Sequence, residues 1–374
     1  MDLLREVDQL ETVLRGGEDQ LPSELRPYYE AVLELQAELR QQVTQNLEYL
    51  DAGPDTILPE LLSNTQATTR SFALHNHIFV RPVLRAKPSD RLCLKMLGWL
   101  HSVHPQTEDI PVSLSDDEAG VIPLDPAIYF MPCSVQYGLL YLPLFFHELG
   151  HILYALHRGQ MDDLVRDLQR RLGELLTPSV QRDDEHQREE ERQRGAIAET
   201  WYEWAQEVFC DAVGYSIGGT AFACALSMYL RMRGPDQYRV PPHQLAGRSH
   251  PVGWLRVRIL ADRARRMGRE EEAHLLEDAW NQIGASMNIA EDYYGFYDDS
   301  FLDPIQDAID EMLVEASPRA FREEEVAPAA AEASPVSPVH LLNLAWSEFL
   351  DNPDGYRRWE ESLVNDFLEG KIPG

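Results

Sequence analysis

Apolar positions recur at helical spacing over the first fifty residues of the chain. Leucine and valine residues between positions 3 and 14 fall on one helical face, a glycine pair and Pro22 interrupt the pattern, and a second helical run extends from Ser23 toward Leu50. The pattern predicts two helices. We interpret them as an α-hairpin that packs on the remainder of the chain, with a coiled coil that binds a partner as the alternative.

Between residues 71 and 132 the pattern changes to short runs of β-branched and aromatic residues bounded by proline, aspartate and glycine. These runs predict three strands and one intervening helix. The run at 128–131 is a candidate edge strand that would pair with an extended substrate backbone, and an ordinary core strand is the alternative. The strands are expected at 71–84, 109–114 and 127–132, the helix at 90–101, and loops or short helices at 51–69.

The second half of the chain is dominated by helical periodicity. A charged stretch at 158–194 with opposite charges four residues apart predicts a solvated helix or helical hairpin broken near Pro178. Apolar runs that include 220–231 and 251–273 predict further helices. The fold class is therefore mainly α with a small β-sheet (α+β). The expected domains are an N-terminal helical segment (1–50), a main domain (51–315), a disordered linker (316–338) and a C-terminal helical segment (339–374).

Charge restricts the classes of partner. The chain carries 63 acidic and 33 basic side chains, a formal net charge of -30. A phosphate backbone or an anionic lipid surface would be repelled by most of such a surface, so neither nucleic acid nor membrane is an expected partner. No apolar run reaches the ~20 residues of a membrane span, and the acidic N-terminus has no signal-peptide pattern. The four widely spaced cysteines are predicted to be reduced, buried thiols. Reduced thiols and the absence of a signal-peptide pattern favour a cytoplasmic protein.

The strongest chemical signal is the sequence HELGH within an apolar helical run at 141–157. His147 and His151 share one face of a helix, where both imidazoles can bind one metal ion while Glu148 acts as a base. Two core histidines on an apolar helix are the alternative. Gly150 in the helix interior suggests the close approach of a neighbouring backbone or of a substrate.

A catalytic zinc ion usually has three protein ligands. The apolar helical run around 199–218 carries Glu207 and Asp211 on one face, where buried carboxylates without a partner would be unfavourable. We expect Glu207 to be the third ligand, with Glu203 as the fallback. Asp211 is expected to bind the free ring nitrogen of one ligating histidine and so to select its tautomer.

A third segment contains Ser249, His250 and Pro251, followed by Arg256. A donor such as His250 can stabilise the oxyanion that forms at a scissile carbonyl. Pro251 suits the first position of a helix, and Arg256 is expected to pair with a buried carboxylate. The alternative is a simple helix cap with a surface histidine.

Taken together, HELGH, the EVFCD sequence that holds Glu207 and Asp211, and the Ser-His-Pro…Arg segment resemble the gluzincin metallopeptidases, in particular the CAAX prenyl protease and heat-shock membrane protease group. The resemblance covers about fifty residues. It implies a zincin-like catalytic core with an HExxH helix and a second metal-ligand helix. The chain departs from that group because it lacks transmembrane helices, so the resemblance implies a soluble relative.

The expected function is therefore a soluble zinc metalloendopeptidase that acts on a cytosolic protein or peptide. The metal ligands would be His147, His151 and Glu207, with Glu148 as general base and His250 as oxyanion donor. Other divalent ions fit the same ligand set. Two alternatives stay open: an inactive scaffold protein with a structural zinc site, and a zinc hydrolase of a non-peptide amide.

Overall fold

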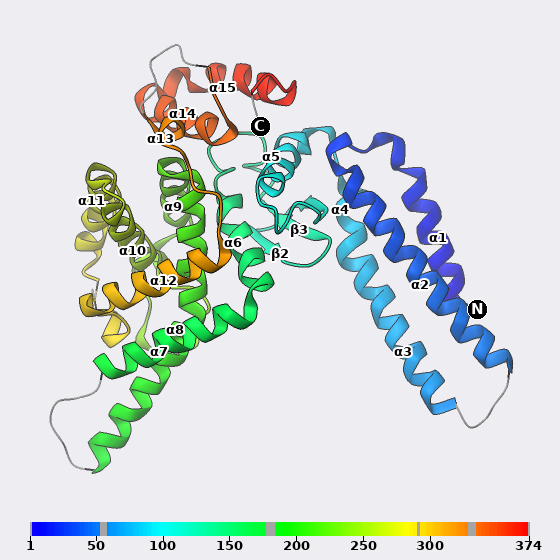
Figure 1. The fold of residues 1–374 in the computed structure, drawn as a ribbon, viewed down its shortest axis with the longest axis horizontal. Coiled ribbons are helices and arrows are strands. Elements are labelled where there is room, and N and C mark those ends of the chain that lie inside the picture. Colours follow the sequence, from blue (N-terminus) through cyan, green and yellow to red (C-terminus); the bar gives the residue numbers. More distant parts are fainter. Residues whose placement is uncertain (1, 53–57, 177–183, 290–291, 328–333, 373–374) are drawn as a thin grey trace. The chain divides into compact units, whose positions relative to one another are not determined.

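The computed structural model describes residues 2–372 apart from 53–57, 177–183, 290–291 and 328–333. The chain divides into two compact units, Met1–Tyr137 and Gly138–Gly374 (Figure 1). Helices and a three-stranded sheet make up its regular structure, which confirms the predicted α+β class. The domain boundaries expected from the sequence stay predictions.

The first unit begins with helices that pack side by side: α1 (Asp2–Gly16), α2 (Arg26–Ala52) and α3 (Leu58–Leu74). The first two confirm the predicted N-terminal helices. Gln36 is buried on α2, and its Nε2 donates a hydrogen bond to the carbonyl of Val7 on α1 (2.6 Å). A buried side chain that pairs with a neighbouring backbone fixes the register of the two helices.

Residues 71–84 are helical, so the prediction of a strand there was wrong. The end of α3 continues through a π-helical turn, His75–Phe79, into α4 (Val80–Arg85). Tertiary packing overrides the β-branched composition of this stretch, because Val80 is buried and the hydroxyl of Tyr28 donates to the carbonyl of Phe79 (3.0 Å). The helix α5 (Arg91–Ser102) confirms the prediction at 90–101.

The sheet contains β1 (Val112–Ser115), β2 (Gly120–Ile122) and β3 (Ala127–Phe130), in the order β1-β3-β2. The strand β3 is parallel to β1 and antiparallel to β2. Both edges of β3 are therefore occupied, which rules out the idea that residues 128–131 form a free edge for a substrate. The core-strand alternative holds, and Ile128 and Tyr129 are buried.

The regular structure among the described residues of the second unit is all helical. Its longest helix, α8, packs along α6 and also contacts α7 and α10. The helix predicted at 251–273 is divided in two by a turn at Gly268, whose φ of 77° favours glycine. The main helices are α6 (Leu144–Leu156), α7 (Arg158–Leu175), α8 (Asp184–Gly218), α9 (Thr220–Met232), α10 (Gly253–Arg266), α11 (Glu270–Met287) and α12 (Leu302–Ala316).

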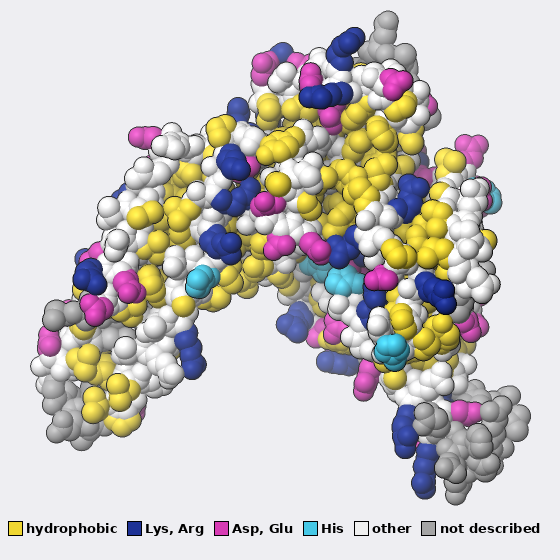
Figure 2. All heavy atoms as spheres, turned by 180° about the vertical axis from the view of Figure 1, so that it is seen from behind, with side chains coloured by type: hydrophobic (Ala, Val, Ile, Leu, Met, Phe, Trp, Pro, Cys, Tyr) yellow, Lys and Arg dark blue, Asp and Glu magenta, His cyan; other side chains and the backbone are white. Residues whose placement is uncertain are grey.

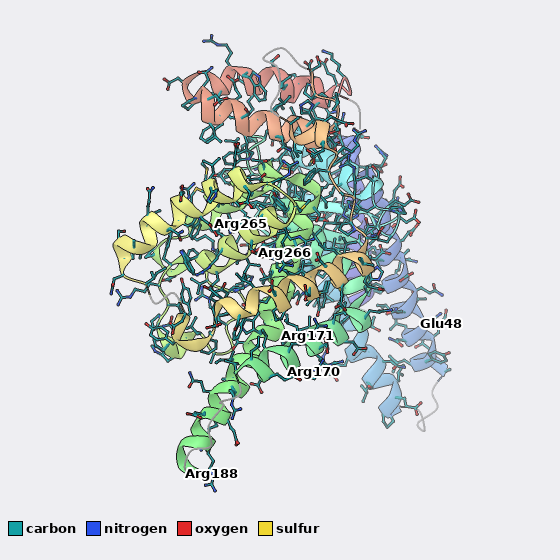
Figure 3. All side chains as sticks on the ribbon, turned by 60° about the vertical axis from the view of Figure 1, so that its left-hand side comes forward. Glu48, Arg170, Arg171, Arg188, Arg265 and Arg266 are labelled. Atoms are coloured by element: carbon teal, nitrogen blue, oxygen red, sulfur yellow. The ribbon has the colours of Figure 1, made fainter. Side chains whose placement is uncertain are left out.

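Ion pairs connect α12 to the helices beside it. Arg171 on α7 lies 3.4 Å from Glu311, and Arg266 on α10 lies 2.5 Å from Asp303; both arginines are labelled in Figure 3. These pairs neutralise one arginine each of α7 and α10 with carboxylates of α12.

The C-terminal region contains α13 (Glu323–Val326), α14 (Pro338–Asp351) and α15 (Pro353–Leu368). The helix α14 packs on α8 and α9 and buries Leu341 and Leu342 completely. These helices therefore return to the body of the second unit. Of the linker predicted at 316–338, the part at 328–333 lies outside the described residues, while Glu325 of α13 is buried.

No helix among the described residues is long and apolar enough to cross a membrane. On the face drawn in Figure 2, hydrophobic side chains are interspersed with charged ones of both signs. All four cysteines are free thiols; Cys93 and Cys210 are buried as predicted, Cys224 is half-buried, and Cys133 is exposed, contrary to the prediction.

Candidate metal centre

The apolar helix α6 carries a cluster of His147, Glu148 and His151. One ligand atom from each of the three residues lies within 4.8 Å of the other two, so the cluster could hold a metal ion. His147 and Glu148 are 7% and 5% exposed, and His151 is half-buried. The four-residue spacing places both imidazoles on one helical face, and their ring centroids lie 5.0 Å apart.

The helix α8 brings Glu207 against both imidazoles. Its Oε2 lies 3.6 Å from Nε2 of His147, and its Oε1 lies 3.5 Å from Nε2 of His151. Two ligands about 2.0–2.1 Å from a tetrahedral zinc ion are about 3.4 Å apart, so each Glu207 oxygen lies near one imidazole at a separation close to that between two ligands. Glu207 is buried, and its Oε2 has no hydrogen-bond partner among the described residues. A bound cation would give a buried oxygen of this kind a partner.

Asp211, one turn further along α8, binds the other ring nitrogen of His147. Its Oδ1 lies 2.9 Å from Nδ1 of His147. It also accepts two hydrogen bonds from Arg256, at 2.8 Å from Nε and 2.6 Å from Nη2. Burial opposes ionisation of Asp211, but the charge and hydrogen bonds of Arg256, with the bond to His147, lower its pKa to about 2. The carboxylate therefore holds a proton on Nδ1 and leaves Nε2 of His147 to face Glu207.

Arg256 is the buried cation of this cluster. Its Nη1 also lies 3.4 Å from Oε2 of Glu207, outside hydrogen-bond geometry. Burial raises the pKa of Glu148 to about 7. On Glu207 burial also acts to raise the pKa, but Arg256 together with His147, His151 and His250 outweighs it and lowers the pKa. Two carboxyl groups thus contact the guanidinium, and the charge of Arg256 also acts on a third, Glu148. Since a buried charge imbalance is costly, a divalent cation fits the electrostatics as well as the geometry.

The second imidazole, His151, has a different environment. Burial lowers its pKa to about 4, so the ring is neutral and can bind a metal. Its Nδ1 lies 3.4 Å from Nε2 of Gln206. Sequence analysis missed Gln206; the only signal was its position directly before Glu207. The fallback ligand Glu203 is exposed.

His250 lies on the loop before α10. Its Nε2 is 3.4 Å from Oε1 of Glu207, and its side chain is 59% exposed. The cluster is therefore accessible to solvent at His250. Ser249 Oγ contacts Nδ1 of His250 at 2.8 Å. Pro251 does not begin the helix as predicted, because α10 starts at Gly253.

The structure therefore brings together His147, Glu148, His151, Glu207, Asp211, His250 and Arg256, all of which sequence analysis singled out. Comparisons of the chain with protein-family models, with curated proteins and with solved structures found no match. The resemblance to gluzincins consequently rests on these motif residues alone.

Proposed function

We propose that the protein is a zinc-dependent metallopeptidase whose metal ligands are Nε2 of His147, Nε2 of His151 and the carboxylate of Glu207. The observation that carries this proposal is the position of Glu207, 3.5–3.6 Å from both ring nitrogens, with one buried oxygen lacking a hydrogen bond. Cysteine-rich donor sets are typical of closed structural zinc sites, and the candidate cluster contains no cysteine.

Bound zinc would supply a Lewis acid that polarises a peptide carbonyl and lowers the pKa of water to about 7. Glu148 is the general base: its carboxylate accepts the proton of the attacking water and passes that proton to the leaving amine. Burial supports this role, because it raises the pKa of Glu148 to about 7, where a carboxyl group can both accept and donate a proton near neutral pH.

The other side chains of the site position a metal ligand or stabilise the oxyanion. Asp211 holds the His147 ring in the tautomer that leaves Nε2 unprotonated, and Arg256 keeps Asp211 ionised. His250 is partly exposed beside Glu207, and a proton on its Nε2 would serve as a hydrogen-bond donor to the developing oxyanion. The substrate class is a protein or peptide.

Metal content of purified variants tests the proposal. Wild type is expected to hold one zinc ion per chain, and His147→Ala and Glu207→Ala to lose it. Glu203→Ala is a matched control, because this exposed carboxylate lies one turn before Glu207 on the same helix. Glu148→Gln should keep the metal while cleavage of a denatured protein substrate falls by about 10²–10⁴-fold.

Two results would refute this assignment. Full metal content in Glu207→Ala would show that Glu207 is not a metal ligand. Cleavage by Glu148→Gln at the wild-type rate would show that Glu148 is not the general base.

A further inference from the structure

The helix α6, which carries His147 and His151, is preceded by a series of tight backbone turns that starts at Leu139. The amide of Leu142 donates to the carbonyl of Leu139 (3.2 Å), and the amide of Phe145 donates to the carbonyl of Leu142 (3.0 Å). Phe145 lies in the first turn of α6, two residues before His147. Two successive backbone hydrogen bonds therefore connect Leu139 to the turn that carries the first histidine.

The amide of Leu139 is bound by the C-terminal helix α15. Leu139 is fully buried, and its N–H donates to Oε1 of Glu360 (2.6 Å). The hydroxyl of Tyr356, one turn earlier on α15, donates to the same oxygen, also at 2.6 Å. A buried amide without a partner is costly, and a carboxylate is a strong acceptor, so Glu360 fixes the start of the turn series.

The backbone beside Leu139 is also in contact with the C-terminal helices. A Cβ atom at Gly138 would lie 3.0 Å from Oε1 of Glu360, so the carboxylate lies directly against the backbone at this point. On the other side, Nε1 of Trp346 on α14 donates to the carbonyl of Leu140 (3.0 Å), and Trp346 is buried. The helix pair α14–α15 thus binds one N–H and one C=O group of the segment that leads into α6.

The same helix pair contacts the other helix of the candidate site. Nδ2 of Asn343 on α14 donates to the carbonyl of Gly218, the last residue of α8 (3.0 Å). A Cβ atom at Gly218 would fall 2.8 Å from Cδ2 of Phe146, which directly precedes His147. The last turn of α8 and the first turn of α6 therefore pack against each other, and α14–α15 is bound to both.

We infer that Glu360 is a positioning residue of the metal centre, which holds the start of α6 so that its histidines face Glu207 on α8. The inference rests on the proposed metallopeptidase function and adds the C-terminal helices to the structure that supports its site. Functional groups have to be held within about 0.5 Å of their working geometry. Loss of the bond to Leu139 would release the turn series and change the separation of the imidazoles from Glu207.

Zinc affinity of the metal-depleted full-length protein, measured by competition with a chelator, tests the inference. Glu360→Ala removes the acceptor and should weaken zinc binding by about three- to tenfold. Glu360→Gln keeps an acceptor oxygen at the same place and should restore the affinity to within about twofold of wild type. This affinity belongs to the folded protein, so a general loss of stability does not change it.

Glu361→Ala is the matched control. Glu361 is the next residue on α15 and is 65% exposed, and it pairs with Arg357, which is 90% exposed. A surface pair of this kind contributes little, so the variant should bind zinc like wild type.

Cobalt(II) bound in place of zinc gives a second measurement, because its visible absorption depends on the arrangement of the ligands. The spectrum should change in Glu360→Ala and stay that of wild type in Glu360→Gln and Glu361→Ala. If Glu360→Ala does not fold, Trp346→Phe takes its place, since it keeps a buried ring and removes only the donor to Leu140. It should weaken zinc binding by a similar factor, and an unchanged affinity would overturn the inference.

Three other results would also overturn it. If wild type binds zinc and Glu360→Ala binds it as tightly as Glu361→Ala, Glu360 does not position the ligands, and the metallopeptidase proposal stays intact. A loss in Glu360→Gln as large as in Glu360→Ala would exclude the hydrogen bond to Leu139 as the cause. Absence of zinc binding by wild type would refute the metallopeptidase proposal itself, and the inference with it.

Discussion

Gly150 on α6 lies so close to Cys210 on α8 that a Cβ atom at position 150 would fall 2.8 Å from the Cα of Cys210. The sequence placed this glycine inside the HELGH motif and predicted that a backbone or a substrate approaches it, and the structure identifies the backbone of α8. Since α6 carries both histidines and α8 carries Glu207, the short distance between these helices also determines how near the carboxylate comes to the imidazoles.

Gly150→Ala should therefore disturb both stability and metal binding. Alanine favours a helix by roughly 1 kcal/mol over glycine, but the contact with Cys210 involves backbone that cannot rotate away, and overpacking costs about 1–3 kcal/mol or more. We expect a lower free energy of unfolding in urea and weaker zinc binding by competition with a chelator. Gly173→Ala on α7 is the control, since nothing lies within 4 Å of a Cβ there. Equal stability and zinc affinity in both variants would contradict the packing argument.

Asp211→Asn should weaken metal binding without removing a proposed ligand. The variant leaves Arg256 buried beside a neutral side chain and weakens selection of the His147 tautomer. We expect zinc affinity to fall about 10–100-fold and stability to fall by about 3 kcal/mol. Chelator competition and urea unfolding measure the two effects. Asp163→Asn serves for comparison, because Asp163 is 78% exposed on α7; a loss of affinity no greater than in that variant would argue against the role of Asp211.

His75 should make the first unit sensitive to acid. It is 3% exposed, its Nε2 has no hydrogen-bond partner among the described residues, and burial lowers its pKa to about 4. An unfolded histidine has a pKa of about 6.5, so the unfolded state takes up the proton first. The free energy of unfolding therefore has its full value above pH 6.5. It falls by on the order of 3 kcal/mol as the pH falls toward 4.

Hydrogen exchange of the amides in residues 2–52 and 58–85, corrected for intrinsic rates at each pH, would measure this loss between pH 7.5 and 5. His75→Leu should flatten the pH dependence because it removes the buried titrating group. His77→Leu changes an exposed histidine on the same π-helical turn and should leave the dependence unchanged. A wild-type slope in His75→Leu would show that another group is responsible.

The spacing of apolar residues predicted the helices that carry the candidate site, because this spacing depends only on residues close together in the sequence. The HELGH spacing places His147 and His151 on one face of any helix, and the same reasoning places Glu207 and Asp211 on one face of α8. The contact between these two helical faces depends on tertiary packing. In the sequence, only Gly150 indicated that another segment approaches the HELGH helix. Gln206 carried no signal of its own, since its contact with His151 depends on the packing of α6 against α8.

The errors arise where tertiary contacts override local preference. Residues 71–84 have the composition of a strand, yet they form helix around a π-helical turn because Val80 and His75 are buried against neighbouring helices. Likewise, strand β3 was recognised as a strand, but no local pattern shows that β1 and β2 occupy both of its edges.

Asn343 provides a test of how the C-terminal helices are attached. This residue lies on α14, and its side chain joins the end of α8 to the start of α9: Nδ2 donates to the carbonyl of Gly218, and Oδ1 accepts from the amide of Ala221, both at 3.0 Å. Asn343→Ala leaves a carbonyl and an amide without these partners, which should lower the free energy of unfolding by about 1–3 kcal/mol.

Urea unfolding followed by tryptophan fluorescence would measure this change, since Trp346 lies one turn further along α14 and is buried. Asn365→Ala on α15 is the matched control, because Asn365 is exposed. If Asn343→Ala unfolds at the same urea concentration as that control, α14 is held by its apolar face alone, through residues such as Leu341 and Leu342. A selective loss of stability would instead show that the polar link at the α8–α9 junction contributes to holding the C-terminal helices against the helix that carries Glu207 and Asp211.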